Sequence, residues 1–399
     1  MPETLIDAPV SHYDPFDPEV LAAVHHHDGL LREVAPVVYI EKYDFYAITR
    51  AEEIQKALRN FRVFSSTDRP FYEPNPFRPN APLMQDPPEH TQTKSVMLRI
   101  FSQENMDKME SYFAEHAERL VDELLADGPV ELDAYRDLAA RYVLKVFPDI
   151  LGLPEEGREL LLKFGDAVFN VLGPHNAHHF QKMEAGQPAL EWVGANVKRE
   201  KQLEGGIGWQ LYQAADEGII TPTEAEQLLT AVFGAGFDTT VFSIAGMLRA
   251  FADNPEEWTK LRENPDLVDS AFEEAVRYYA PSRYGGRVAV KETELAGIRI
   301  PEGAKILVMW LGAGRDPRKW ENPDEFRIDR PAASGHLSFG FGIHTCAGQA
   351  VARMEGRSIL NALVKRVAKI ELTGEPRPAI NFQAFGHDYI PIRMTPAPE

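Results

Sequence analysis

The sequence of 399 residues contains a single cysteine, Cys346, so it has no second thiol for an internal disulfide. Scarcity of cysteine is typical of proteins that work in a reducing compartment. No uninterrupted apolar run reaches the roughly 18 residues that indicate a membrane-spanning helix. The N-terminal segment MPETLIDAPVSHYDPFDPEV lacks the basic and apolar regions of a secretory signal. We therefore expect a cytoplasmic protein that does not cross a membrane.

Positive charge is also scarce. The chain has 42 Lys and Arg against 61 Asp and Glu, which gives a formal net charge of −19. Such an acidic chain is a poor candidate for non-specific binding to nucleic acid or anionic membranes. Hydrophobic residues make up 44% and charged residues 26%, which is typical of a globular protein with a substantial core. The histidines at 25–27 predict a solvated turn, because adjacent residues cannot share one helical face.

Helical periodicity dominates the chain, notably over residues 103–128, 155–173 and 352–372. Alternating patterns predict a strand pair in 37–50 and two strands around Pro-Glu-Gly in 292–310. No repeat, low-complexity segment or domain linker is evident. We predict a single domain over residues 1–399, mainly α, with a minor β-region drawn from both ends of the chain.

One long helix is predicted from a capping box, with Thr221 as N-cap and Glu224 three residues later, to about Asn254. Its centre reads GAGFDTT, although each glycine in a helix interior costs about 1 kcal/mol relative to alanine. Close packing against another helix would explain these glycines. We favour the alternative, in which a flat group approaches the backbone there.

Cys346 lies in the glycine-rich stretch FGFGIHTCAG, residues 339–348. A free cysteine is most often a buried, inert apolar residue. Here a helix-periodic segment follows directly, so the sulfur would sit at a helix N-terminus, which favours the thiolate. Such a sulfur is a nucleophile or a metal ligand, and the spacing alone does not exclude His344 as a base for a nucleophile.

Several motifs together resemble those of the cytochrome P450 superfamily. FGFGIHTCAG is similar to the haem-ligand loop F-G-x-G-x-H/R-x-C-x-G, with Ala347 where leucine is common. AGFDTT resembles the distal-helix signature, and EEAVRYYAP contains the E-x-x-R pair Glu274 and Arg277. FRIDRP supplies Arg330, and DPPEHTQTK resembles an H-x-x-x-R segment with Lys94 in place of arginine. E-x-x-R means little singly, but all five motifs occur in the family's order.

This resemblance implies a triangular helical body with haem between a long distal helix and a proximal Cys loop. The thiolate of Cys346 would be the axial ligand of haem b, iron protoporphyrin IX, and would push electron density toward the iron. Glu274, Arg277 and Arg330 would form a buried structural network. The expected partners of the haem propionates are His90, Lys94, Arg287, His336 and, with less support, His344.

The resemblance also implies a monooxygenase that uses O2 and two electrons. Thr239 would hydrogen-bond the oxygen, Asp238 would relay protons, and Gly236 would let dioxygen and substrate approach the helix. The chain has no flavin or nicotinamide fingerprint, so a separate ferredoxin or flavodoxin-type donor with its NAD(P)H reductase is expected. Arg99 and Arg353 are the predicted docking residues for an acidic donor.

The substrate pocket should be lined by aromatic and apolar side chains, which fits a small, largely apolar aromatic molecule. KVFPDILGL and VFNVLGP are similar to a bacterial branch that oxidises para-substituted benzoates and O-demethylates methoxy-aromatics. The turn before Asp238 lacks donors for a carboxylate, so either Arg69 or Arg283 would replace them, or the substrate is a neutral phenol or ether. The predicted lining is Phe71, Tyr72, Phe77, Phe169, Leu172, Phe233, Ala235, Tyr284 and Phe385.

Alternatives remain open from the sequence. The same fold could act as a peroxygenase or oxidise a terpene-like apolar molecule. A non-catalytic haem-thiolate sensor is a further possibility, against which the Asp238–Thr239 pair argues. A thiol-dependent hydrolase would use Cys346 as a nucleophile.

Overall fold

The computed structural model describes residues 6–67 and 81–398. Phe71, Tyr72, Phe77 and Arg69 of the predicted pocket therefore lie outside the described residues. The α-helices are α1 (Pro18–Ala22), α2 (Val24–Val34), α3 (Ala51–Arg59), α4 (Glu89–Ile100), α5 (Gln103–Asp107), α6 (Glu110–Leu125), α7 (Arg141–Leu151), α8 (Leu160–Val171), α9 (Ala177–Asn196), α10 (Ile207–Asp216), α11 (Pro222–Ala235), α12 (Asp238–Asp253), α13 (Pro255–Glu263), α14 (Val268–Tyr279), α15 (Trp310–Ala313) and α16 (Gln349–Arg366).

The strands are short. They are β1 (Ile6–Asp7), β2 (Val10–Ser11), β3 (Val37–Ile40), β4 (Phe45–Ile48), β5 (Phe64–Ser65), β6 (Val130–Asp133), β7 (Gly285–Ala289), β8 (Thr293–Leu295), β9 (Ile298–Ile300), β10 (Lys305–Val308), β11 (Val367–Leu372), β12 (Arg377–Pro378), β13 (His387–Tyr389) and β14 (Pro391–Pro396). One of the 3₁₀ helices is used below, η6 (Gly342–His344).

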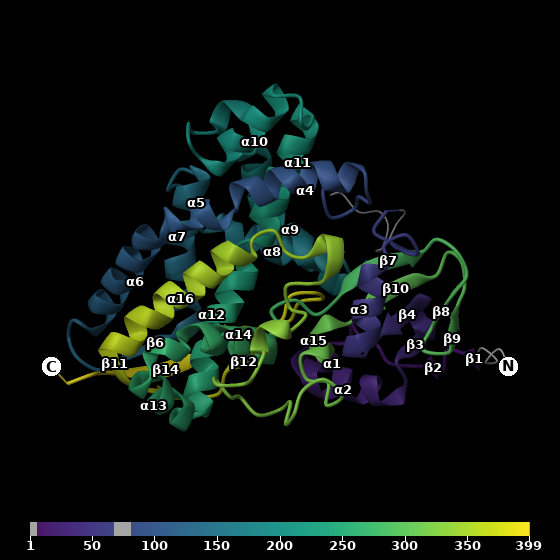
Figure 1. The fold of residues 1–399 in the computed structure, drawn as a ribbon. Coiled ribbons are helices and arrows are strands. Elements are labelled where there is room, and N and C mark those ends of the chain that lie inside the picture. The colour runs from purple at the N-terminus through teal and green to yellow at the C-terminus, as the bar shows by residue number, and fades with distance from the viewer. Residues whose placement is uncertain (1–5, 68–80, 399) are drawn as a thin grey trace.

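The molecule has a roughly triangular outline, with a helical body and a β-rich corner near the N-terminus (Figure 1). The largest sheet at that corner has the order β2-β3-β4-β10-β7-β5. In it β10 runs parallel to β4 and antiparallel to β7, so that Ile306 lies opposite both Tyr46 and Arg287. A second sheet, β11-β14-β6, joins the C-terminus to the helical body. The predicted mainly α architecture with β-regions from both ends is confirmed.

Two of the predicted segments change structure part-way. The helical pattern over 352–372 continues only to Arg366, and the alternating V-A-K-I-E-L that follows forms β11, paired with β14. In 292–310, strands β9 and β10 flank Pro301-Glu302-Gly303 as predicted, but they belong to different sheets. The hairpin is instead formed by β8 and β9, whose turn has positive φ at Ala296 and Gly297. Pairing partners distant in sequence decided both outcomes.

The capping box of the long helix is present, with Glu224 N donating to Thr221 Oγ1 at 3.1 Å and Thr221 N donating to Glu224 Oε2 at 2.7 Å. The helix is not continuous, because it divides into α11 and α12 at residues 236–237. The combined segment Pro222–Asp253 is apolar enough to span a membrane, but 72% of its most apolar window is buried inside the structure. A core helix of a globular protein accounts for that composition.

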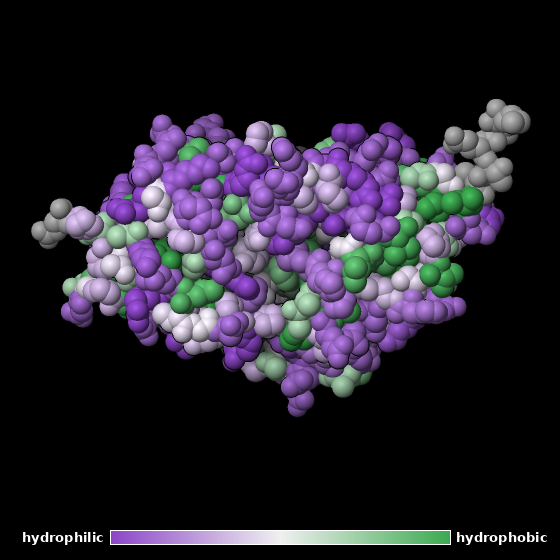
Figure 2. Space-filling model, turned by 90° about the horizontal axis from the view of Figure 1, so that it is seen from below, coloured by the Kyte–Doolittle hydropathy of each residue, from purple (hydrophilic) through white to green (hydrophobic). Residues whose placement is uncertain are grey.

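The outer surface is mainly hydrophilic. Figure 2 shows the face seen from below, where hydrophobic groups gather toward the β-rich corner. The N-terminal elements β1, β2 and α2 carry the exposed apolar side chains of Ile6, Val10, Leu30 and Val34. Exposed apolar side chains are normal on globular proteins.

Three charged residues form a buried network behind the helical body. Glu274 and Arg277, both in α14, have no exposed surface, and Arg330 is only 5% exposed. Arg277 Nε donates to Glu274 Oε2 at 2.6 Å, and Arg330 Nε donates to both Glu274 oxygens at 3.0 Å. Both guanidinium groups also donate to the backbone oxygen of Glu325, so the network holds the 321–330 segment against α14.

Removal of Arg330 should destabilise the protein strongly. Arg330→Leu leaves a buried carboxylate with fewer donors, so we expect the free energy of unfolding to fall by about 3–5 kcal/mol. Chemical denaturation measures this value. The control is Arg393→Leu, which breaks an exposed pair with Glu131 and should cost at most about 1 kcal/mol. Equal losses in the two variants would contradict a structural role for the network.

Candidate functional site

The loop before α16 has an unusual backbone shape. Gly340 and Gly342 adopt positive φ values of 70° and 73°, which glycine adopts at little cost. The loop closes on itself through Cys346 N, which donates to Phe339 O at 2.8 Å. A Cβ at Gly342 would lie 2.5 Å from Leu58 O, so the missing side chain lets the loop rest on the end of α3.

Cys346 is placed at the start of α16, as predicted. Burial raises the pKa of its thiol, while the backbone N–H groups of Gly348 and Gln349 and the charges of Lys94 and Arg353 act to lower it. The side chain nevertheless has substantial exposed surface. A sulfur that is enclosed by protein and still exposed lies on the wall of an interior hollow.

We infer that the junction of α11 and α12, which also presents open surface, forms the opposite wall of this hollow. Ala235 is exposed although it lies midway along a buried helix, and Thr239, one turn later, is partly exposed. Thr239 Oγ1 donates to Ala235 O at 2.7 Å, and Thr240 Oγ1 donates to Gly236 O at 3.3 Å. The threonine hydroxyls therefore satisfy carbonyl groups at the break, which explains why two threonines follow the glycines.

Gly236 does not face this hollow. A Cβ at this position would lie 2.4 Å from Phe147 Cε1 of α7 and 2.8 Å from Val232 O. The expectation that Gly236 admits dioxygen and substrate is therefore wrong. An aromatic ring occupies the space that a side chain at this position would need, so close helix packing explains this glycine. Ala235 is the residue that presents open surface.

Asp238 is an isolated buried acid. It is 4% exposed, and its Oδ2 atom has no hydrogen-bond partner. A Cβ at Gly165 in α8 would lie 1.9 Å from that oxygen, so the glycine makes room for the carboxyl group. Burial, reinforced by the charge of Asp166, raises the pKa of Asp238 well above its usual value, while Lys182 opposes this effect. The carboxyl group is therefore protonated at pH values where an ordinary aspartate is ionised.

A cluster of basic side chains, His90, Lys94, Arg287 and His344, lies where α4, β7 and η6 meet. The ring centroids of His90 and His344 are 4.3 Å apart, and Lys94 Nζ donates to Thr345 O. The Nε2 atoms of both histidines lack hydrogen-bond partners. We call these four residues the basic cluster.

The protonated forms of the side chains in the basic cluster are disfavoured. Burial, with the charge of Lys94, lowers the pKa of His90 to about 4. Burial and neighbouring positive charges lower the pKa of His344 to about 2, and burial lowers that of Arg287 to about 10. Asp86 favours the charged form of Arg287, but it accepts hydrogen bonds from Ser65 Oγ and Ser66 N. Such a cluster suits an anionic group.

A sequence profile of the cytochrome P450 family matches residues 139–384. The chain belongs to the cytochrome P450 family. It is therefore a P450 monooxygenase with haem b as its cofactor, and the fold predicted from its motifs is confirmed.

Individual relatives cover nearly the whole chain. Cytochrome P450 CYP199A2 of Rhodopseudomonas palustris is 39% identical over 96% of this chain and 94% of its own length. Beta-dihydromenaquinone-9 omega-hydroxylase of Mycobacterium tuberculosis is 28% identical over 97% of this chain and 79% of its own length. The crystal structure of P450BioI in complex with an acyl carrier protein ligated to hexadec-9Z-enoic acid has a TM-score of 0.84 and 25% identity, covering 94% of this chain and 100% of that chain. The chemical variety of these names shows that membership of the family does not identify a substrate.

The residues of this P450 fit haem. The enclosed but exposed Cys346 would ligate the iron from one wall of the hollow, opposite Ala235 and Thr239. The basic cluster would hold the two propionate groups, because its unpartnered donors and excess positive charge match two carboxylates. Lys94 offers a point charge there, where an arginine would offer a two-pronged donor.

His336 does not join the basic cluster. Its Nε2 atom lies 3.3 Å from Glu273 Oε2, and its Nδ1 atom accepts from Ser338 N at 3.1 Å. Hydrogen bonds from His336 and Arg353 bring the pKa of Glu273 to about 2 despite its burial. His336 and His344 are both close to Cys346 in the sequence, but only the tertiary structure shows that they have different neighbours. The role of His336 as a propionate partner therefore stays a prediction, separate from the basic cluster.

Some residues of the predicted pocket are core residues instead. Phe233 has no exposed surface and Tyr284 only 1%, and the hydroxyl group of Tyr284 donates to Leu172 O at 3.3 Å. Phe385 packs edge-on against His25, and Phe169 clusters with Phe242. Ala235 and Leu172 retain accessible surface. Aromatic residues serve cores and pockets alike, so the sequence could not separate them.

Arg283 cannot bind a substrate carboxylate in this structure. Its side chain has no exposed surface. Its Nη1 atom donates to Pro15 O at 2.8 Å, and its Nη2 atom lies 3.2 Å from Asp28 Oδ1. It joins the N-terminal segment to the segment after α14, which is a structural role.

Two residues near the distal helix were missed at the sequence level. Gly165, which accommodates Asp238, is a glycine inside an apolar helical pattern, a recognised sign of close approach by another group. Glu355 of α16 is fully buried, both its carboxyl oxygens lack hydrogen-bond partners, and burial raises its pKa well above the usual value. The sequence signal for Glu355 was the position of an acidic residue on the apolar face of the predicted helix.

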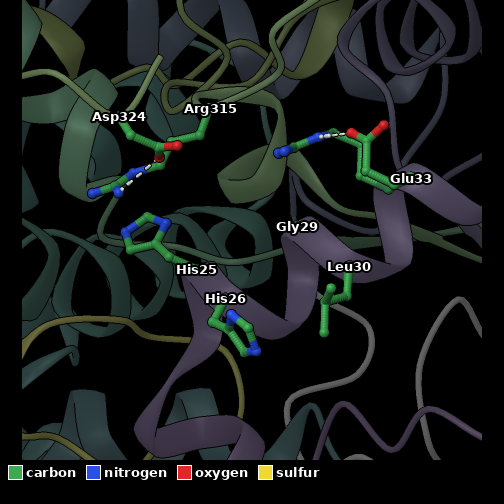
Figure 3. A pocket seen from close by; sticks show the side chains of 8 residues that line it. His25, His26, Gly29, Leu30, Glu33, Arg315 and Asp324 are labelled. Carbon is green, nitrogen blue, oxygen red and sulfur yellow. Dashed lines mark hydrogen bonds and ion pairs between the residues drawn. The ribbon is translucent and has the colours of Figure 1, made fainter. Parts of the chain in front are cut away.

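The histidines at 25–27 form the first turn of α2, so the predicted solvated turn is wrong. His25 and His26 line a surface hollow of about 370 Å³, in which His25 is turned toward the ion pair of Arg315 and Asp324 (Figure 3). Burial lowers the pKa of His25 well below its usual value. Within the described ranges, no group of three or more His, Cys, Asp or Glu residues could hold a metal ion.

Replacement of Arg287 should weaken haem retention. Arg287→Met removes a charged donor from the basic cluster, a loss of about 1.5–3 kcal/mol, and should speed haem release about tenfold to a hundredfold. Transfer of haem to an excess of apomyoglobin measures the rate. Arg299→Met, on the exposed face of β9, is the control and should release haem at the wild-type rate. Unchanged release from Arg287→Met would contradict the assignment of the basic cluster.

Proposed function

We propose that this P450 hydroxylates or O-demethylates small aromatic molecules that carry a methoxy or alkyl group, using O2 and electrons from a ferredoxin or flavodoxin-type donor. The observation that carries the proposal is the pairing of the buried Asp238, which lacks a hydrogen-bond partner on Oδ2, with Thr239 beside open surface at Ala235. An acid and an alcohol at this point can deliver protons to oxygen. A carrier or sensor has no need for them.

The proposed reaction conserves atoms and electrons. One atom of O2 enters a C–H bond of the substrate, and the other leaves as water with two protons and two electrons from the donor. At a methoxy group the hydroxylated carbon then releases formaldehyde and leaves a phenol. Haem, when bound, supplies the site of dioxygen activation, and a thiolate ligand favours cleavage of the O–O bond.

The residues of the chain supply protons and positions. Thr239 lies at the open face of the helix, where its hydroxyl group could turn from Ala235 O and donate a proton into the hollow. Asp238 stores a proton behind it, enclosed by Gly165. On the outer side, Lys182 Nζ and Asp166 Oδ2 form an ion pair at 2.8 Å, and Asn381 Nδ2 donates to Asp166 Oδ1 at 2.9 Å. These groups can restore the proton of Asp238 from solvent.

An uncharged substrate is favoured. Among the described residues, the candidate cations are engaged elsewhere, Arg283 with Asp28 and Arg287 within the basic cluster. Among the candidate lining residues that the structure describes, Ala235, Leu172 and Thr239 keep accessible surface, and their side chains offer one hydroxyl group and no charge. Burying a carboxylate there without a partner would be costly.

The substrate class is tested with a matched pair, 4-methoxybenzamide and 4-methoxybenzoate. They differ in charge but hardly in shape. We expect the amide to bind more tightly, about tenfold or more, as measured by the shift in haem spin state during titration, and to yield formaldehyde on turnover. Tighter binding of the benzoate would contradict the uncharged class and direct attention to Arg69.

Gly165→Ala should impair proton delivery. The new Cβ would lie 1.9 Å from Asp238 Oδ2, so the carboxyl group must move. We expect less product for each NADPH consumed and more hydrogen peroxide, with substrate affinity unchanged. Gly194→Ala is the control, because a Cβ there meets no atom within 4 Å. Equal coupling in both variants would show that the position of Asp238 is unimportant.

The pH dependence of turnover should reflect Asp238. Its pKa is raised, so the carboxyl group holds its proton at low pH and loses it as the pH rises through the raised value. Donor-supported turnover should therefore decline on the alkaline side, and Asp238→Asn should remove this decline while lowering the rate by about 10²–10⁴-fold. An identical pH profile in Asp238→Asn would contradict the assigned role.

A further inference from the structure

A second hollow lies apart from the haem site, between one face of α2 and the segment that follows α15. It has a volume of about 370 Å³, and its lining includes His25, Gly29 and Arg32 of α2, together with Arg315 and Asp324. We call it the α2 hollow. A hollow of this size can accept a small organic molecule. None of these five residues has a part in the haem site or in the proposed oxidation.

His25 forms part of the wall of the α2 hollow, and its ring is turned toward the ion pair of Arg315 and Asp324 (Figure 3). Both ring nitrogens are buried, and neither has a hydrogen-bond partner among the described residues. Burial, followed by the positive charges of Arg315 and Arg277, lowers the pKa of His25, so the ring is neutral and carries one N–H donor. A buried polar group without a partner costs free energy of folding. His25 therefore indicates a binding partner that the protein itself does not supply.

Two arginines of the α2 hollow are held in place by backbone carbonyl groups. Arg315 Nε and Nη2 donate to Tyr278 O at 3.3 and 3.2 Å, and its guanidinium group lies 3.9 Å from the ring centroid of Tyr278. Arg32 Nη1 donates to Gly312 O at 2.8 Å. A guanidinium group has five N–H bonds, so each arginine keeps donors beyond these contacts. Donors fixed in this way bind an anion with little further loss of side-chain freedom.

Gly29 leaves the surface of α2 open between His25 and Arg32, which are about 10 Å apart along the helix axis. Apart from the backbone of the helix itself, a Cβ at Gly29 would meet only Arg32 Nη2, at 3.7 Å, which is an ordinary contact. The residue has no positive φ that would require glycine. Glycine disfavours a helix, and neither packing nor backbone geometry explains this one. Its missing side chain leaves a floor on which a ligand can lie.

Positive and negative charges lie at different depths in the α2 hollow. The side chains of Arg315 and Arg32 are only 15% and 11% exposed. Those of Asp324 and Glu33 are 78% and 52% exposed. Glu33 is also paired with Arg318 at 2.8 Å, and hydrogen bonds from Arg318 and Arg32 bring its pKa to about 2. The acids therefore lie at the solvent-exposed rim, and the buried part presents guanidinium groups, which suit an anion.

We propose that the α2 hollow binds a small organic carboxylate. A carboxylate group of the ligand replaces Asp324 on Arg315 and accepts the N–H of His25. The rest of the ligand lies over Gly29 toward Arg32. Asp324 Oδ1 lies 3.2 Å from Arg315 Nη1, which shows that a carboxylate fits this position. Exposed ion pairs contribute little stability, so Asp324 can swing into solvent at low cost. The site goes beyond the proposed oxidation and does not depend on it.

The test is calorimetric titration of the haem-loaded protein with succinate, whose two carboxylates suit the two arginines. The reference titration uses sodium chloride at equal ionic strength, so that general screening is subtracted. Wild-type protein should bind succinate saturably, and His25→Leu should bind it about tenfold or more weakly, because a buried donor to a charged group is lost. The control is His27→Leu, which makes the same change on α2 outside the α2 hollow and should keep the wild-type affinity.

Two further measurements make the outcome decisive. Asp324→Asn should bind succinate about threefold more tightly, because a competing carboxylate loses its charge. Without succinate, the midpoint of thermal unfolding of His25→Leu should be no lower than that of the wild type, because two unpartnered nitrogens are removed. Absence of saturable binding in the wild type, equal affinity in His25→Leu, or weaker binding in Asp324→Asn would overturn the proposed site. Tighter binding of inorganic phosphate than of succinate would show an inorganic-ion site and overturn the organic ligand.

Discussion

The arrangement of the site depends on burying positive charge where α4, β7 and η6 converge. His90, Lys94, Arg287 and His344 come from three segments distant in sequence, and burial, followed by neighbouring positive charge, lowers the pKa values of His90 and His344 there. Free energy lost by such burial is recovered when an anionic group accepts their hydrogen bonds. Haem carries two carboxylates, and we propose that these four residues would hold them and so set the orientation of the cofactor.

The two walls of the hollow are built by different means. On the proximal side, glycines let the Cys loop rest on the end of α3, and the buried Glu274–Arg277–Arg330 network holds the 321–330 segment against α14. On the distal side, the long helix is opened between Ala235 and Asp238, and threonine hydroxyls satisfy its carbonyl groups. The charges of the Glu274–Arg277–Arg330 network are paired with one another. The second wall leaves Oδ2 of one acid, Asp238, without a hydrogen-bond partner, and the proposed proton transfer depends on this acid.

Much of this could be predicted from sequence, and the failures have a common cause. Short motifs with strict spacing, such as FGFGIHTCAG, correctly indicated the family, because the residue at each position is set by a local structural requirement. Predictions that rested on residue type alone were less often correct. Phe233 and Tyr284 are core residues, Gly236 packs against Phe147, and Arg283 is bound to Asp28. Aromatic, glycine and arginine residues each serve several purposes, and only their neighbours in space distinguish these.

The sequence by itself determined the family, the place of Cys346 at a helix start, the capped helix with a weakened centre and the acid–alcohol pair. These features are local, since a few consecutive residues decide them. The tertiary structure decided which histidine joins the basic cluster, that Arg283 is bound to Asp28, and that Asp238 is enclosed by Gly165. Each of these depends on the distance between side chains far apart in the chain. Charge, burial and pKa follow from that distance and not from the order of the residues.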